Sequence, residues 1–433
     1  MIRSSLAIAA GKLARGVSRL RGGGSALPGL VTERIDPRIL GHTLTDLPGG
    51  IVVVTGTNGK TTTTKMLVAV LRAHGRRVFT NPTGSNFTRG VISAMLAEIP
   101  LSGRLDADWA VLELDEAHAL HFAAAVAPTH ALLLNVARDQ LDRFAEIDQT
   151  AQLLTRLAEQ TTTGVVLNVD DSFVSRIHRS VPEGADVAWF GVDPGCADRL
   201  SELQEADVRE ADGAAGLPDG AEASLLVVRD ERSFSIRTPG ADVGPVTLQQ
   251  RGLAAMINAT AATAAARAVL GDDFDPGVTT TALAATTPPF GRGEVIEVDG
   301  QPLELVLVKN PAGFTVALGT YGSEPVATMI AINDNYADGR DVSWLYDVSF
   351  ESLREQGVAV TSGVRGWDMA LRLHYDGVGV DATEPDLDVA LDTFLAAHAG
   401  APTRIFCTYT AMMHLRRRLA ARYGLPRFGE DAS

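Results

Sequence analysis

A short run of residues near the start of the chain has the composition of a phosphate-binding loop. It reads VTGTNGKTT, covers residues 54–62, and lies between an apolar segment and a segment with helical periodicity. Backbone N–H groups and a helix N-terminus attract an anion there, Lys60 adds a positive charge, and Thr61 offers the hydroxyl that such loops place on Mg²⁺. Val54 stands where the usual loop has its first glycine. The run therefore predicts a shortened nucleotide-binding loop.

A second candidate for binding chemistry is a carboxylate that could hold a metal ion, Glu113. Glu113 lies near the end of the apolar run 109–114, which reads as a buried strand. Open parallel sheets bind ligands at the carboxyl ends of their strands, so Glu113 and Thr61 together predict a site with oxygen ligands for Mg²⁺. A solvated acid at a strand end is the alternative. Further polar residues follow at the same edge of the sheet, and each could belong to the site or to the solvated surface: Asp115, Glu116 and His118.

Two further predicted strand ends also carry polar clusters. The first covers residues 135–143, and we expect one or two of its members to face the cleft: Arg138, Asp139, Gln140, Asp142 and Arg143. The second covers residues 168–171, where Asp170 and Asp171 are also consistent with caps of a turn.

The C-terminal part of the chain repeats this pattern of polar residues after apolar runs. Arg292 lies in a glycine-rich turn, Lys309 and Asn310 follow one predicted strand, and Asp334 follows another. Arg340 is a candidate to stabilise a transferring phosphoryl group, because electrostatic stabilisation dominates that chemistry. Each of these stretches alone would indicate only a turn. Together they predict a second wall that closes over the nucleotide.

Alternating strand and helix patterns position these residues. Apolar runs at 51–54, 78–80, 109–114, 131–135 and 165–168 alternate with helical patterns at 61–73, 89–98, 117–125 and 150–160. Such alternation predicts an α/β fold with a parallel sheet covered by helices on both faces. Residues 194–243 are predicted to form an inserted or appended β element, with a hairpin of strands 225–228 and 233–236. An alanine-rich helix is predicted at 252–270, and further strands at 303–308, 327–332 and 404–407.

These patterns divide the chain into three parts. Residues 1–44 hold a basic helix and a lead-in that is irregular over 28–48, residues 45–287 hold the phosphate loop, and residues 288–433 form a smaller α/β domain. The first helix carries Arg3, Lys12, Arg15 and Arg19 and no acid. We expect it to dock on the body of the protein, with contact to anionic lipid as the alternative.

Composition excludes several classes of function. The net charge of −15 disfavours bulk binding of nucleic acid, and no apolar stretch reaches the roughly 18 residues that a membrane-spanning helix needs. The two cysteines, Cys196 and Cys407, are far apart, so neither a disulfide framework nor a cysteine zinc site is expected. Nothing in the sequence resembles a complete glutaminase or hydrolase triad.

Taken in order, these motifs resemble the Mur ligase family. The matching stretches are residues 56–62, 111–114, 134–143, 168–171 and 291–294. The C-terminal stretches at 309–314 and 334–344 resemble more narrowly the MurT branch, the synthetase subunits of lipid II isoglutaminyl synthases. Mur ligases are ATP-dependent enzymes that make an amide through an acyl phosphate, with a P-loop central domain followed by a smaller α/β domain.

The resemblance assigns roles to particular residues. It implies that ATP is bound by Thr57, Asn58, Gly59, Lys60, Thr61, Thr62, Asn258, Arg292, Lys309, Asn310 and Asp334. It implies that Mg²⁺ is bound by Thr61 and Glu113, and that Arg340 and Glu113 support catalysis.

Three departures from the family pattern stand out. Gln140 replaces the metal-binding histidine of the amino-acid-adding enzymes, and no lysine between Lys65 and Lys309 can serve as their carbamylated lysine. A ligase that uses ammonia would not need that arrangement. Some MurT relatives carry a four-cysteine zinc ribbon in mid-chain, but residues 194–243 hold only Cys196, so no zinc is expected.

The resemblance implies amidation of the D-Glu α-carboxylate of the lipid II stem peptide, with ammonia from a glutamine amidotransferase partner of the GatD type. Asp347 or Asp341 is then the candidate to lend an acid to the partner's site, and a structural role is equally consistent with either. The protein is expected in the cytoplasm, at most peripheral at the inner face of the membrane. The alternatives are an amino-acid-adding ligase of the folylpolyglutamate synthase type, or a nucleotide-binding subunit without catalysis.

Overall fold

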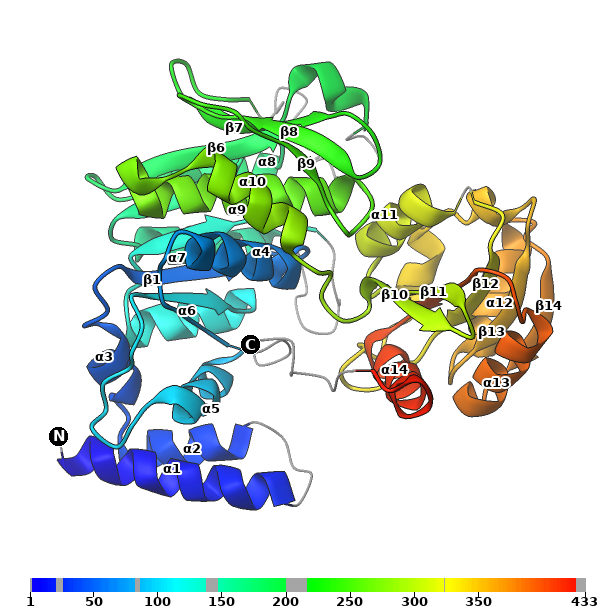
Figure 1. The fold of residues 1–433 in the computed structure, drawn as a ribbon, viewed down its shortest axis with the longest axis horizontal. Coiled ribbons are helices and arrows are strands. Elements are labelled where there is room, and N and C mark those ends of the chain that lie inside the picture. The colour runs from blue at the N-terminus through cyan, green and yellow to red at the C-terminus, as the bar shows by residue number, and fades with distance from the viewer. Residues whose placement is uncertain are drawn as a thin grey trace.

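Two β-sheets organise the chain (Figure 1). The computed structural model describes residues 2–20, 26–81, 86–137, 147–199, 216–322 and 324–425. Within these residues, a nine-stranded sheet forms the N-terminal body and a six-stranded sheet forms the C-terminal body. The predicted α/β class with parallel sheets is confirmed.

The first sheet carries the phosphate loop. In spatial order its strands are β2 (Val78–Thr80), β3 (Trp109–Glu113), β1 (Gly50–Thr55), β4 (His130–Leu133), β5 (Gly164–Asn168), β6 (Asp186–Val192), β7 (Ala223–Val228), β8 (Ser233–Arg237) and β9 (Val243–Thr247). Strands β2 to β7 pair in parallel, and β8 and β9 are antiparallel. Every residue of β1, β3, β4 and β5 is buried, as expected for strands covered on both faces.

Helices cover both faces of this sheet. The apolar core on one face includes α4 (Lys60–Ala73), α9 (Leu253–Leu270) and α10 (Pro276–Ala285), and the core on the other face includes α5 (Thr88–Glu98), α6 (Glu116–Ala125) and α7 (Ile147–Glu159). Shorter helical segments are α8 (Ser172–Ser175), η1 (Arg176–Ser180), η2 (Pro194–Arg199) and η3 (Gly271–Asp273). Within the described ranges, the segment Leu253–Asp273 alone is long and apolar enough to cross a membrane, and most of it is buried inside this body.

The second sheet has the order β10 (Arg292–Val298), β11 (Gln301–Leu307), β15 (Thr403–Cys407), β12 (Ala327–Ala331), β13 (Val358–Ser362) and β14 (Val380–Glu384). Only the edge strand β10 is antiparallel. Around it lie α11 (Pro311–Tyr321), η4 (Ser343–Asp347), η5 (Glu351–Leu353), α12 (Gly366–Tyr375), α13 (Leu387–Ala397) and α14 (Tyr409–Tyr423). The strands predicted near 303–308, 327–332 and 404–407 are confirmed.

The prediction of an irregular lead-in over residues 28–48 is wrong. The N-terminal helix α1 (Ile2–Leu20) is followed by α2 (Ala26–Ile35) and α3 (Ile39–Leu44). Pro28 lies in the first turn of α2, where its missing N–H group costs no hydrogen bond. A Cβ atom on Gly29 would lie 2.1 Å from the carbonyl oxygen of Arg89, so this glycine permits close packing on α5 rather than breaking the helix.

The predicted hairpin of residues 225–228 and 233–236 is confirmed as β7 and β8. Strand β7 pairs in parallel with β6, with Phe190 opposite Ser224, so the hairpin extends the central sheet instead of forming a separate unit. The predicted alanine-rich helix is α9, and the predicted basic helix is α1, which packs on α2 and α5.

Buried charges join the two bodies. Arg404 in β15 is fully buried and pairs with Glu304 at 2.8 Å and Glu324 at 2.7 Å. Arg251, which precedes α9 in the first body, also pairs with Glu324 at 2.7 Å. Because Arg404 is fully buried, removing its acidic partners would leave a buried charge unpaired, at a cost of about 3–5 kcal/mol. The network fixes the second body against the first on the side of the phosphate loop.

A buried histidine makes stability depend on pH. His130 in β4 is packed against Trp109, with ring centroids 5.7 Å apart, and burial lowers its pKa from 6.5 to about 4. Between pH 4 and 6.5 the folded state therefore binds fewer protons than the unfolded state. The free energy of unfolding therefore rises with pH between 4 and 6.5, by about 3 kcal/mol from this group. We expect His130→Phe, which keeps the ring contact, to remove that contribution in urea unfolding measured across the window. If the difference in the free energy of unfolding between wild type and His130→Phe does not change with pH, the prediction is wrong.

Candidate active site

The phosphate loop folds as the sequence predicts, between β1 and α4. Gly59 has φ +87° and precedes the first residue of α4, so the loop turns into the helix N-terminus. A Cβ atom on Gly59 would lie 2.3 Å from Oδ1 of Asn258 in α9. This explains both the glycine and the position of Asn258 against the loop. The N–H groups of the first turn of α4 therefore face the side of the loop where an anion would lie.

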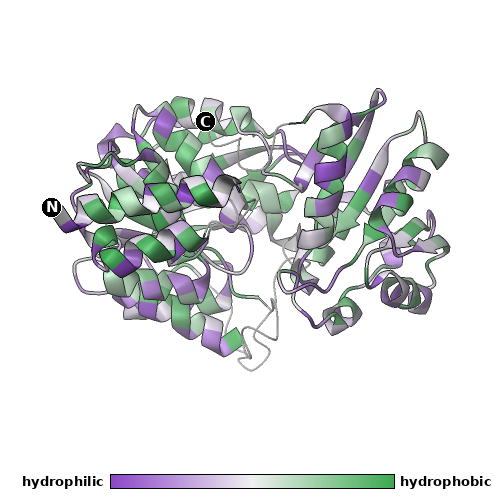
Figure 2. Ribbon diagram, turned by 90° about the horizontal axis from the view of Figure 1, so that it is seen from below, coloured by the Kyte–Doolittle hydropathy of each residue, from purple (hydrophilic) through white to green (hydrophobic). Residues whose placement is uncertain are grey.

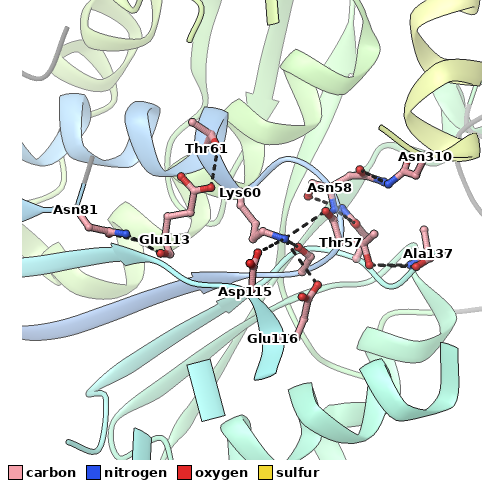
Figure 3. A network of polar contacts seen from close by, with 12 residues as sticks. Thr57, Asn58, Lys60, Thr61, Asn81, Glu113, Asp115, Glu116, Ala137 and Asn310 are labelled. Atoms are coloured by element: carbon pink, nitrogen blue, oxygen red, sulfur yellow. Dashed lines mark hydrogen bonds and ion pairs between the residues drawn. The ribbon is translucent and has the colours of Figure 1, made fainter. Parts of the chain in front are cut away.

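Lys60 is buried and points back over the loop (Figure 3). Its Nζ donates to the carbonyl oxygen of Gly56 at 2.7 Å, and it lies 3.3 Å from Asp115 Oδ1 and 3.8 Å from Glu116 Oε1. Glu116 is buried, so this residue at the start of α6 belongs to the site and is not a solvated surface residue. These carboxylates hold the ammonium group in place beside the loop.

Thr61 and Glu113 meet as predicted. The Thr61 hydroxyl donates to Glu113 Oε1 at 2.7 Å, and Arg292 Nη2 donates to Thr61 Oγ1 at 3.1 Å. Asn81 fixes the backbone of Glu113 through two hydrogen bonds, of 2.8 and 2.9 Å (Figure 3). Burial raises the pKa of Glu113, while the charge of Arg292 and the hydrogen bond from Thr61 oppose that shift.

These two side chains fit Mg²⁺. A carboxylate and a hydroxyl are hard oxygen ligands, and Mg²⁺ is usually held by one or two protein ligands, with water and phosphate oxygens completing its shell. A cation would also compensate the buried charge of Glu113. No group of three or more histidine, cysteine or acidic side chains that could hold a metal occurs among the residues that the structure describes. Phosphate oxygens and water would therefore complete the coordination.

The second wall also reaches the loop. Asn310 caps α11 by accepting from the N–H of Gly313 at 2.7 Å, and its Nδ2 donates to Asn58 Oδ1 at 3.0 Å. Asn58 is held from the first body as well, because its N–H donates to Asn135 Oδ1 at 2.8 Å. Asn58 therefore connects both bodies at the middle of the loop (Figure 3).

A cavity of about 210 Å³ opens between the loop, α9 and α11. It brings together six of the predicted binding residues: Asn58, Gly59, Thr62, Asn258, Arg292 and Lys309. Apolar residues of α9 and α11 line it too, among them Ala255 and Val316. Polar groups of the loop beside apolar residues of two helices suit a ligand that has both a phosphate chain and an aromatic base.

Comparisons with known proteins identify the family of the chain. The family model of the Mur ligase middle domain matches residues 54–266, and the model of the MurT ligase C-terminal domain matches residues 307–412. A relative from Streptococcus pneumoniae, named lipid II isoglutaminyl synthase (glutamine-hydrolyzing) subunit MurT, is 31% identical over 97% of this chain and 98% of its own length. The chain belongs to the MurT family. A Staphylococcus aureus protein of the same name is 28% identical over 86% of this chain and 88% of its own length.

Solved structures agree on the fold. MurF from Acinetobacter baumannii matches 92% of this chain and 81% of its own, with a TM-score of 0.67 and 18% identity. Folylpolyglutamate synthase from Mycobacterium tuberculosis, complexed with ADP and AMPPCP, matches 90% of this chain and 95% of its own, with a TM-score of 0.61 and 18% identity. As a member of the MurT family, this chain is an ATP-dependent ligase of the Mur type.

Among the remaining predicted residues of this MurT-family chain, Thr57 lies in the loop, where its hydroxyl donates to the carbonyl oxygen of Ala137 at 3.2 Å, and four others do not line the cavity. Asp334 pairs with Arg365 at 2.7 Å and does not line the cavity. Arg340, Asp341 and Asp347 are exposed on the second body, and the carboxylate of Asp341 accepts from the N–H of Ser343 at 2.8 Å. Their roles in binding and catalysis stay predictions. Arg138, Asp139, Gln140, Asp142 and Arg143 lie outside the described residues.

Asp171, at the end of β5, does cap a turn, because its Oδ1 accepts from the N–H groups of Phe173 and Val174 at 2.9 Å. Its Oδ2 accepts from the N–H of Val136, and Asp171 also lines the cavity. Burial raises its pKa to about 6. Asp171 therefore fixes the chain after β4 to the chain after β5, beside the cavity.

Sequence reasoning missed two residues of the cavity. Arg251 and Tyr321 both line it, and the Arg251 guanidinium lies 5.3 Å from the centre of the Tyr321 ring. Arg251 precedes α9 and Tyr321 ends α11, so they meet only because the two bodies pack together. No motif in the sequence marks either residue.

Thr61 and Glu113 also line a second cavity, of about 430 Å³, between α4, β2 and α10. Thr64 and Thr80 line it too, and their buried hydroxyls have no hydrogen-bond partner among the described residues. The pair of Thr61 and Glu113 thus lies beside the loop on one side and beside this second cavity on the other.

Proposed function

We propose that this chain uses ATP to convert the α-carboxylate of D-Glu in the lipid II stem peptide to a carboxamide, which gives D-isoglutamine. The observation that carries the proposal is the buried pair of Thr61 and Glu113, between Lys60 and Arg292, next to the cavity. The chain also aligns over 98% of the length of the pneumococcal protein named for this reaction.

ATP would bind with its phosphates on the loop. The N–H groups at the start of α4 and the charges of Lys60 and Arg292 suit the phosphates, and the apolar surfaces of α9 and α11 suit the base. Thr61 and Glu113 would hold Mg²⁺, which neutralises charge on the phosphates when it is bound. The MurF structure from Thermotoga maritima, of the same fold, is a complex with ADP.

The chemistry needs an activated carboxylate, since a carboxylate is a poor electrophile until one of its oxygens becomes a leaving group. A carboxylate oxygen attacks the γ-phosphorus of ATP, ADP leaves, and an acyl phosphate forms. The nitrogen of ammonia then attacks the carbonyl carbon, phosphate leaves, and the nitrogen loses one proton. Lys60 and Arg292 would stabilise charge on the transferring phosphoryl group.

Ammonia would come from a partner subunit of the GatD type. Cys407 is buried in β15, and burial raises the pKa of its thiol, which makes it unreactive. The relatives are named as one subunit of a glutamine-hydrolyzing enzyme. This chain has a surface suited to a partner: Trp367, Leu371 and Tyr375 recur every four residues along α12 and are 66%, 48% and 67% exposed.

We call these three residues the α12 patch. Tyr346, which is 55% exposed, adjoins it, since its ring lies 6.3 Å from that of Tyr375. Contiguous exposed aromatic side chains are typical of protein interfaces. Asp347 follows Tyr346 directly, so a partner that covers the α12 patch would meet Asp347. Since lipid II is lipid-linked, we also place the protein at the inner face of the membrane.

The test is the product made by the purified chain with lipid II, ATP, Mg²⁺ and ammonium, without any partner. We expect ADP release and a product about one dalton lighter than the substrate, because a hydroxyl is replaced by an amino group. Omission of ammonium is the control and should leave the substrate mass unchanged. Addition of a whole amino acid, or ADP release without any change of lipid II, would overturn the proposal.

A further inference from the structure

Helix α1 packs on the body through small and apolar residues. Ala7, Ile8 and Gly11 are buried, and a Cβ atom on Gly11 would lie 2.1 Å from Thr32 Oγ1 and 2.7 Å from Leu96 Cδ1. The inner face of α1 therefore lies directly against α2 and α5. The opposite face takes no part in this packing.

That outer face is apolar. Leu6, Leu13 and Val17 follow one another at spacings of seven and four residues, which places them in one line along the helix, and the turn between the two leucines carries Ala9 and Ala10. Leu6 is 61% exposed, Leu13 74% and Val17 47%. We call Leu6, Leu13 and Val17 the α1 stripe. A helix on the surface of a globular protein normally carries polar residues on this face, so the α1 stripe needs another explanation.

The charged side chains of α1 itself are all positive, and the acidic Glu98 of α5 interacts with Arg15 on the inner side of the helix. Arg3, Lys12 and Arg15 lie on α1, and the first acidic residue of the chain is Glu33, whereas the whole chain has a net charge of −15. At 100° per residue, Arg3 and Lys12 fall on opposite sides of the α1 stripe. The helix therefore presents an apolar line between cations, on a protein that is otherwise acidic.

Helix α1 also has a peripheral position in the molecule (Figure 1). Helices α1 and α2 form the outer edge of the N-terminal body, away from the C-terminal body (Figure 1). Viewed from below, hydrophobic residues recur along the helices at the N-terminal end of the molecule (Figure 2). Two more exposed leucines lie on or next to the elements that pack on α1, namely Leu27 at the start of α2 and Leu101 just after α5, and they are 51% and 55% exposed.

We propose that the α1 stripe inserts into the headgroup region of a bilayer that contains anionic lipid. An apolar line flanked by Lys and Arg is the pattern of a helix that lies in a membrane interface, where anionic headgroups attract the cations. A second copy of the chain fits less well, because a symmetric pairing of α1 helices would bring like charges together. The surface adds to the proposed function, but its binding to lipid requires neither ATP nor lipid II.

The test measures flotation of the purified full chain with vesicles, without ATP or substrate. One set contains phosphatidylcholine alone, and the other contains equal parts of phosphatidylglycerol and phosphatidylcholine. We expect the wild-type chain to bind the anionic vesicles more tightly, with affinity that falls as salt rises. Leu13→Asp should weaken that binding at least about tenfold, because it places a charge in the middle of the inserted line.

The matched control is Val389→Asp on α13, which changes an exposed apolar residue of the second body. It should bind anionic vesicles like the wild type, and both variants should melt at the wild-type temperature, since both side chains are exposed. Equal binding by wild type and Leu13→Asp, or no binding to either kind of vesicle, would overturn the proposal. So would a dimer of the wild-type chain that Leu13→Asp dissociates, because a second copy would then cover the stripe.

Discussion

Replacing Glu113 by glutamine is expected to lower the rate of ATP-dependent amidation by about 10²–10³-fold while the fold stays intact. The substitution keeps an oxygen that can accept the 2.7 Å hydrogen bond from Thr61, but it removes the negative charge that would hold Mg²⁺. The backbone of the residue stays fixed by Asn81. Because burial raises the pKa of Glu113, a neutral amide should fit the buried position without loss of stability.

The rate of ADP release with saturating lipid II and ammonium is the measurement, with thermal unfolding as the check on the fold. The rate should be recorded over a range of Mg²⁺ concentrations, since loss of a metal ligand shifts the concentration needed for half the maximal rate. Glu159→Gln, which changes an exposed carboxylate at the end of α7, is the control and should behave like wild type. A Glu113→Gln variant with unchanged turnover and unchanged Mg²⁺ dependence would mean that Glu113 is a structural residue.

The sequence predicted the first half of this site well, because the relevant signals are local. An apolar strand, a glycine at positive φ and a helix start occur within a few residues, so the position of Lys60 and Thr61 follows from the run itself. Glu113 is at the end of a neighbouring parallel strand, and β1 and β3 pair so that Val54 lies opposite Glu113. Parallel pairing brings the two strand ends to the same edge of the sheet.

The contributions of the second body were harder to predict, because they depend on how two sheets pack. Asn310 was expected at the nucleotide, and the structure places it as the cap of α11 with a bond to Asn58. Arg251 and Tyr321 line the cavity without any signal in the sequence. The local sequence pattern does not predict a contact between Arg251 and Tyr321, because the two residues are about 70 positions apart and each lies at an ordinary helix end.

The loop around Asp334 shows what residue types alone do not reveal. The sequence predicted Asp334 as a contact of ATP, and it gave no sign that the Asp334 carboxylate pairs with Arg365. Asp338, which carried no prediction, is buried and accepts hydrogen bonds from the N–H and the hydroxyl of Thr410. It fixes the loop that leads to Arg340. The order of this loop thus depends on a contact with α14, far away in the sequence.

A second large effect is expected at Asp347. If Asp347 completes the active site of a glutaminase partner, Asp347→Asn should lower glutamine-dependent amidation by about 10⁴-fold, the loss typical when the acid of a catalytic triad becomes an amide. Amidation with free ammonium should stay at the wild-type rate, because that reaction uses only the site at the phosphate loop. Both rates are measured on the complex of the two subunits, with glutamine or ammonium as the nitrogen source.

Asp341→Asn is the matched variant, since Asp341 lies on the same exposed segment and was an equal candidate. Its carboxylate is already used within the chain: hydrogen bonds from Ser343 lower its pKa, which is typical of an acid that caps a turn. We therefore expect Asp341→Asn to affect both nitrogen sources alike, and only slightly. Loss of both activities in Asp347→Asn would indicate a structural role, and a complex that fails to form would place Asp347 in the interface without a part in the chemistry. A shared active site is supported only if Asp347→Asn loses glutamine-dependent amidation and keeps amidation with free ammonium.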